Sequence, residues 1–137
     1  MIKPKHLKRG DKIAIVSLSW GGLGDEAFLH KYHIAKRRLE EEFGLQVVTM
    51  PHALKGTAYV AAHPEKRAQD LMDAFKDPDI AAVISAIGGD DAIRTLPFID
   101  FEIIRENPKI FMGYSDTTIN RSEERRGGKE CRYGWWA

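Results

Sequence analysis

Short apolar runs alternate with amphipathic stretches along the first 120 residues of the chain. The runs are rich in β-branched residues and predict strands at 11–19, 45–50, 80–87 and 109–112. The stretches between them predict helices over 25–43, 64–76 and 101–105, with a further short helix that Pro97 closes. Strands and helices that alternate with short connections are typical of an α/β fold with a mostly parallel sheet flanked by helices.

The first predicted helix has recognisable ends and one apolar face. Asp25 is placed to act as its N-cap, and Gly44 lies where a C-cap is expected. Aromatic and aliphatic residues recur at steps of three and four, which predicts a single buried stripe. The stripe consists of Phe28, Tyr32, Ala35, Leu39 and Phe43.

The second predicted helix follows residues 52–62, which we expect to form a loop that pivots at Gly56. Pro64 suits the first turn of a helix, because its missing amide hydrogen would have no partner there. Asp77-Pro78 ends the pattern, since the residue before proline avoids helical geometry. The predicted buried stripe is Ala68, Leu71, Met72 and Phe75.

Composition narrows the class of protein. The chain has 137 residues, 43% of them hydrophobic and 30% charged, with a net charge of +1. These values are ordinary for a globular domain and give no reason to expect a nucleic acid or a membrane as partner. The basic N-terminus lacks the apolar core and cleavage site of a signal peptide, so we expect a cytoplasmic location. The single cysteine, Cys131, excludes an intramolecular disulfide.

The stretch Lys109-Ile-Phe-Met-Gly-Tyr-Ser-Asp-Thr-Thr118 carries the candidate chemistry. An apolar run stops at Gly113, Ser115 follows two residues later, and Asp116 can open a helix. A strand that turns sharply into a helix with serine at the corner is the layout of a nucleophile elbow, although the second glycine of the usual pattern is Thr117 here. A serine that only caps the following helix would give the same local pattern.

Three loops that could form a site follow predicted strands. They are the turn 20–24, the segment Gly88-Gly89-Asp90-Asp91, and the corner at Ser115. In open parallel sheets the carboxyl ends of the strands lie at one edge, where ligands bind. We therefore expect these loops to converge on one site.

The composition changes from residue 121 onward. Residues 121–137 hold five of the 21 basic residues, the only cysteine and two of the three tryptophans. They show neither helical nor strand periodicity, and they interrupt the helix expected after Ser115. The stretch resembles translated adaptor or vector sequence. We expect a domain over 1–120 that is incomplete at its C-terminus and a disordered, non-native tail over 121–137, with a basic interaction tail as the alternative.

The motifs at 87–91 and 107–118, together with 12–19 and 65–80, resemble the LD-carboxypeptidase family of serine peptidases over about residues 1–120. The resemblance implies a flavodoxin- or Rossmann-like N-terminal domain. The Gly-Gly-Asp-Asp form is similar to the microcin C self-immunity branch, whereas the murein-recycling tetrapeptidases more often carry Arg-Gly-Gly-Tyr-Gly at this turn.

The resemblance also implies roles for individual residues. The nucleophile is Ser115, and the oxyanion hole consists of backbone amides of Asp116 and of Gly88 or Gly89. A glutamate and a histidine from a C-terminal domain complete the triad, and no metal or cofactor is used. None of the chain's histidines matches the catalytic one. We expect the substrate contacts to come from Trp20, Asp90 and Asp91.

The reaction implied is hydrolysis of the amide at the free-carboxylate end of a small peptide through an acyl-enzyme. Substrates are L,D-linked murein peptides in one branch and aminoacyl-adenylate-like conjugates in the other, and full-length members are commonly homodimers. The chain alone is expected to be inactive. One alternative is a nucleotide-binding module built on Gly22 and Gly24, although the second strand lacks the acidic residue that would hold a ribose. Another is an interaction fragment acting through its tail.

Overall fold

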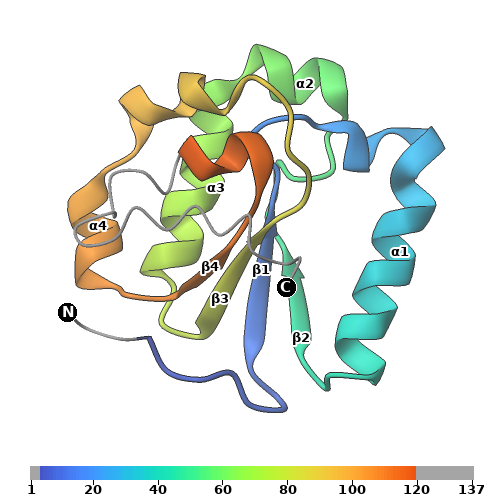
Figure 1. Ribbon diagram of the computed structural model, residues 1–137, viewed down its shortest axis with the longest axis vertical. Helices are drawn as coiled ribbons and strands as arrows, with labels where there is room; N and C mark the ends of the chain where they lie inside the picture. The colour runs from blue at the N-terminus through green and yellow to red at the C-terminus, as the bar shows by residue number, and fades with distance from the viewer. Residues whose placement is uncertain (1–3, 120–137) are drawn as a thin grey trace, which may run out of the picture.

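The computed structural model describes residues 4–119, with the expected tail, 121–137, outside this range (Figure 1). The strands are β1 (Lys12–Val16), β2 (Gln46–Thr49), β3 (Ile80–Ser85) and β4 (Ile110–Met112). The α-helices are α1 (Glu26–Glu41), α2 (Thr57–Ala62), α3 (Pro64–Lys76) and α4 (Phe101–Glu106). Three 3-10 helices are η1 (Gly22–Gly24), η2 (Ala92–Phe98) and η3 (Ser115–Thr118).

The four strands form one parallel sheet in the order β2-β1-β3-β4. This confirms the predicted α/β class, and the order is that of flavodoxin-like folds. The chain moves from β1 to one side and then returns to place β3 on the other side. The strand order therefore reverses between β1 and β3, and the loops that follow these two strands meet at the edge drawn uppermost in Figure 1.

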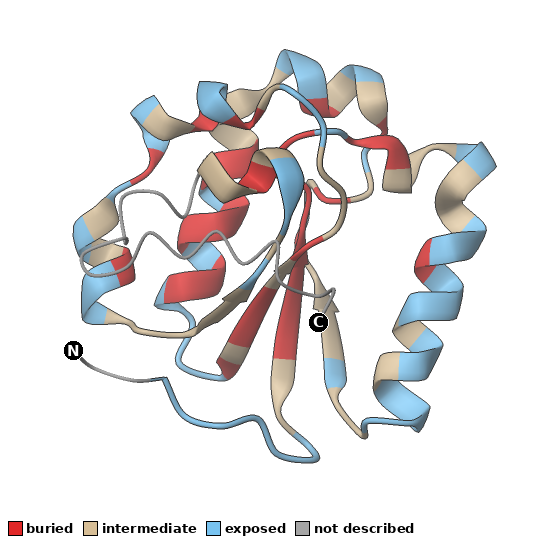
Figure 2. Cartoon of the chain, in the orientation of Figure 1, coloured by how far each residue is buried: buried red, intermediate tan, exposed pale blue. Residues whose placement is uncertain are grey.

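The core lies between the sheet and α3. The predicted stripe of α3 is confirmed, because all four of its residues are buried (Figure 2). They pack on alternate residues of the central strands, including Ala14, Val16 and Val83. Pro64 opens the helix at its first turn, and the helix ends at Lys76, before Asp77-Pro78, both as predicted. Full burial of a large apolar side chain such as Leu71, Met72 or Phe75 contributes roughly 1.5–3 kcal/mol of transfer free energy.

The predicted stripe on α1 is only partly correct. Tyr32 is buried and Phe28 and Leu39 are partly buried, whereas Ala35 is exposed and Phe43, beyond the end of the helix, is 60% exposed. The reason is that α1 packs on β2, an edge strand whose own residues are at most half-buried. A helix over a sheet edge needs a narrower apolar contact than one over the sheet centre. Tyr32 makes that contact and also hydrogen-bonds Thr49.

The segment predicted as a loop, 52–62, contains helix α2. Gly56 does act as the pivot, with φ of +86°, but the helix begins at the next residue. The Asp25 carboxylate accepts hydrogen bonds from the Thr57 amide, at 2.8 Å, and from the Thr57 hydroxyl. Asp25 makes no side-chain cap on α1, so the predicted cap serves a different helix.

Two smaller boundaries also differ from the sequence predictions. Strand β3 ends at Ser85, which releases residues 86–91 to form a loop. Pro97 lies inside η2 and does not close it. Among residues 4–119, no helix combines the length and apolarity needed to cross a bilayer.

Candidate active site

Ser115 occupies a strained corner between β4, which ends at Met112, and η3. Its φ is +59°, and it is the only described residue other than glycine with a positive φ. Left-handed backbone at a residue with a Cβ costs about 1–3 kcal/mol and persists where the surroundings hold it in place. The Ser115 side chain is exposed, while Thr117, two residues later, is buried. The turn therefore exposes the Ser115 side chain to solvent, while the buried Thr117 side chain packs into the domain.

The backbone of Gly88 lies in close contact with Ser115. A Cβ built on Gly88 would lie 2.9 Å from the Cβ of Ser115 and 3.2 Å from its Oγ. A Cβ on Gly89 would lie 2.4 Å from the Oγ of Ser19. Any side chain at either position would displace the neighbouring serine. The glycine pair is thus explained by close approach of two loops, and the structure brings the predicted motifs at 88–91 and 113–116 together.

The carboxylate of Asp116 connects the corner to both other loops. Its Oδ2 accepts a hydrogen bond from the hydroxyl of Ser19, after β1, and one of 2.7 Å from the amide of Ala92, after β3. The amide of Trp20 donates to the carbonyl of Gly88 at 3.3 Å. Loops after β1, β3 and β4 therefore meet, as the convergence argument predicts.

Arg67 of α3 holds the loops from below and is the residue that sequence reasoning missed. Its guanidinium is 1% exposed. Nη1 donates to the carbonyls of Leu18 and Ser19 at 3.1 Å each, and Nη2 lies 2.9 Å from Oδ2 of Asp91. A buried charge is tolerated only with such partners. The sequence does contain one indication that Arg67 is buried: it lies one helical turn before Leu71, on the same face of α3 as the apolar stripe.

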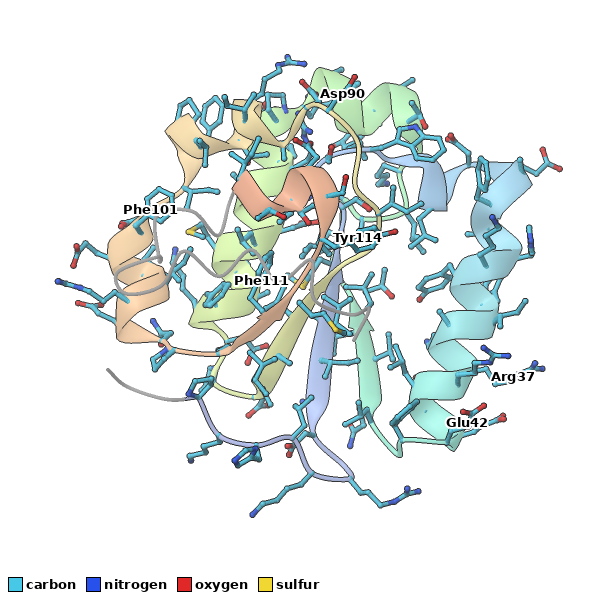
Figure 3. All side chains as sticks on the ribbon, viewed as in Figure 1. Arg37, Glu42, Asp90, Phe101, Phe111 and Tyr114 are labelled. Carbon is cyan, nitrogen blue, oxygen red and sulfur yellow. The ribbon has the colours of Figure 1, made fainter. Side chains whose placement is uncertain are left out.

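The three residues expected to contact substrate differ in whether their side chains already have partners within the protein. Asp91 already binds both Arg67 and Arg94 through its Oδ2, so its carboxylate is committed within the protein. Asp90 is exposed in the loop after β3, and Tyr114 is 70% exposed; both are labelled in Figure 3. Trp20 is 37% exposed, with its ring 5.3 Å from that of Phe28. A substrate role remains a prediction for Trp20, Asp90 and Asp91.

The histidines lie elsewhere among the described residues, and none hydrogen-bonds Ser115. His52 is the most constrained, because Oδ1 of Asp70 lies 2.7 Å from its Nδ1 and Oδ2 accepts its amide at 2.9 Å. Burial raises the pKa of Asp70 above its usual value, although the hydrogen bonds from His52 act in the opposite direction. His63 contacts Glu65 near the start of α3. Within residues 4–119, no group of three or more His, Cys, Asp or Glu residues is placed to hold a metal ion.

The glycines after β1 are explained by packing. A Cβ on Gly22 would lie 2.5 Å from the Trp20 ring, and one on Gly24 would lie 2.4 Å from the carbonyl carbon of Leu54. Close packing therefore accounts for both glycines, and the nucleotide-binding alternative stays untested.

These features define a class: parallel α/β domains with an exposed serine at a strand-to-helix corner beside the switch point of the sheet. Residues 13–124 match the family described as the LD-carboxypeptidase N-terminal domain. The chain therefore belongs to this family, as the sequence motifs predict.

Individual relatives agree with this assignment. A probable murein peptide carboxypeptidase of Bacillus subtilis is 38% identical over 118 residues, which is 85% of this chain and 35% of the relative. An MccF-like protein of Bacillus anthracis superposes with a TM-score of 0.78 at 36% identity, covering 86% of this chain and 35% of that one. An MccF-like protein of Streptococcus pneumoniae in complex with AMP gives 0.75 at 41% identity, covering 82% and 33%. The chain spans about a third of the length of these relatives.

Proposed function

We propose that Ser115 is the nucleophile of a serine carboxypeptidase that hydrolyses the C-terminal amide bond of small peptides. The observation that carries the proposal is the strained corner, which holds an exposed hydroxyl against Gly88 at the carboxyl edge of the sheet. Membership of the LD-carboxypeptidase family supports the reaction class.

The proposed reaction has two steps. Ser115 Oγ attacks the amide carbonyl and gives its proton to a base, while the carbonyl oxygen becomes an oxyanion. Collapse of this intermediate breaks the C–N bond, the amine takes up the proton, and an ester to Ser115 remains. Water then attacks the ester and releases the acid and the serine.

The oxyanion is stabilised in this proposal by the backbone amides of Asp116 and of Gly88 or Gly89. The proposal is supported by position, because Asp116 follows Ser115 directly and Gly88 lies against Ser115. Each such donor is typically worth about 3–4 kcal/mol in the transition state.

No base accompanies Ser115 within residues 4–119, where no histidine hydrogen-bonds it. We therefore propose that the 137-residue chain is inactive by itself and that, as the family resemblance implies, the glutamate and histidine come from a further domain. The candidate substrates are L,D-linked murein peptides and aminoacyl-nucleotide conjugates. The Bacillus subtilis relative, by its name, supports the first, and the AMP complex of the Streptococcus pneumoniae protein supports the second.

A graft tests the proposal. Residues 13–119 replace the matching segment of the Bacillus subtilis relative, and release of the terminal D-amino acid from an L,D-tetrapeptide and of the amino acid from an acyl-sulfamoyl adenylate are measured. We expect turnover of one of them, and loss of at least about 10³-fold in the Ser115→Ala graft. Ser17→Ala, which removes a buried hydroxyl bonded to the Ala53 carbonyl, is the matched control. Unchanged turnover in the Ser115→Ala graft would refute the nucleophile assignment.

A further inference from the structure

The backbone at Ser115 requires support from its surroundings. A serine with φ of +59° is in a conformation that residues with a Cβ avoid, and such residues return to the common regions unless their neighbours prevent it. Close contact with Gly88 restricts the positions open to the Ser115 side chain. Within the turn, the hydroxyl of Thr117 donates to the carbonyl of Tyr114 at 2.8 Å. Neither of these contacts ties the turn to the rest of the sheet edge by a hydrogen bond.

The Asp116 carboxylate supplies that connection. It takes one donor from the hydroxyl of Ser19 and one from the amide of Ala92, which lie 97 and 24 residues away in the sequence. Ser19 is 2% exposed, and its carbonyl is held in turn by the buried guanidinium of Arg67. Hydrogen bonds to a charged acceptor are the stronger kind, and both meet on the same oxygen.

We infer that Asp116 is a positioning residue whose carboxylate holds Ser115 in its left-handed conformation by clasping the turn to the loops after β1 and β3. The inference rests on the proposed role of Ser115 as nucleophile and adds a second task for Asp116, whose amide is proposed to serve the oxyanion hole. The side chain and the amide of one residue then fix the nucleophile and the oxyanion site in a single geometry. Figure 1 shows the turn after β4 beside the loop after β3, and the hydrogen bond from the Ala92 amide to Asp116 joins them.

The test measures the backbone of residue 115 directly, in the full chain. Three-bond coupling constants between Hα and the preceding carbonyl carbon, measured by NMR, report the sign of φ. The variants are Ser19→Ala, which removes one donor, and Asp116→Ala, which removes the acceptor. We expect positive φ to dominate in the wild-type chain and the ratio of left-handed to other conformers to fall about tenfold or more in both variants.

Two matched controls separate positioning from general destabilisation. Ser17→Ala loses a buried hydroxyl bonded to the Ala53 carbonyl at 2.7 Å, and Asp70→Ala loses a carboxylate that, like Asp116, takes one amide and one side-chain donor. Both should lower the thermal midpoint and leave the coupling at Ser115 unchanged. If Asp116→Ala does not fold, Ser19→Ala carries the comparison.

The inference is overturned if Ser19→Ala and Asp116→Ala keep the positive φ and lose only stability, or if the two controls change φ as well. The coupling constant is independent of any chemistry at the hydroxyl. Failure of this inference therefore leaves the Ser115→Ala result of the graft unaffected, and failure of the graft leaves the coupling pattern unaffected.

Discussion

Replacing Arg67 by methionine should be among the most damaging single changes outside the candidate site. The guanidinium is 1% exposed and makes hydrogen bonds to two carbonyls at 3.1 Å and to the Asp91 carboxylate at 2.9 Å. Methionine fills similar volume but leaves the two buried carbonyls without this donor and leaves Asp91 paired only with Arg94. Removing one partner of a buried ion pair costs about 3–5 kcal/mol. For a domain of this size, that corresponds to a fall of roughly 10–20 °C in the thermal midpoint.

The matched control is Arg94→Met, because Arg94 binds the same oxygen of Asp91 from the solvent side. Its Nη1 lies 3.3 Å from Oδ2, but the side chain is 52% exposed. Exposed ion pairs contribute about 0–1 kcal/mol, so this variant should lose little. The free energy of unfolding is measured by urea titration on the two variants and the wild-type chain. Equal losses in both variants, or a loss below about 1 kcal/mol in Arg67→Met, would show that burial does not set the energetics of this cluster.

Three further changes give measurable outcomes. Gly88→Ala places a Cβ 2.9 Å from the Cβ of Ser115 and should destabilise the chain by about 1–3 kcal/mol in urea titration, whereas no loss would mean that the corner is free to move. Hydrogen bonds from the Thr57 hydroxyl and amide lower the pKa of Asp25. The wild-type chain should therefore be more stable than Asp25→Ala above pH 4, and this difference should vanish as the pH falls through the lowered pKa. Burial raises the pKa of Asp70, so its contribution to stability should change with pH in the opposite direction. The free energy of unfolding of the wild type relative to Asp70→Asn should be greatest below about pH 4 and decline as the pH rises through the raised pKa. Thermal midpoints across a pH series check both, and parallel pH profiles for the two carboxylates would contradict the reasoning.

The parts of the fold that sequence predicted are those set by local pattern and central burial. Helix α3 lies over the middle of the sheet, so its spacing of apolar residues matches its buried face. Helix α2 was missed because its first amide is capped by Asp25, 32 residues earlier in the sequence. The stripe of α1 was overestimated because an edge strand buries less than a central one. Local periodicity contains neither of these pieces of information.

In the candidate site, too, some features could be predicted from local sequence and others could not. Ser115 and Gly88 stand out because their motifs require a particular backbone, and the structure places them in contact. The partners of Asp91 and Asp116 could not be read from the sequence, since a carboxylate gives no local sign of whether it faces solvent or a buried donor. Arg67 is the clearest case: an arginine on a helix is normally solvated, and only the shared spacing with the apolar stripe distinguishes this one.

The proposed reaction depends on the hydroxyl of Ser115 as the reacting group. We would map peptides by mass spectrometry after a fluorophosphonate reacts with the graft and with the 137-residue chain; we propose that the graft has the base and that the chain lacks it. We expect one adduct on the graft, located at Ser115, and weak or no labelling of the 137-residue chain alone. An adduct on another serine of the grafted segment, with Ser115 unmodified, would contradict this expectation.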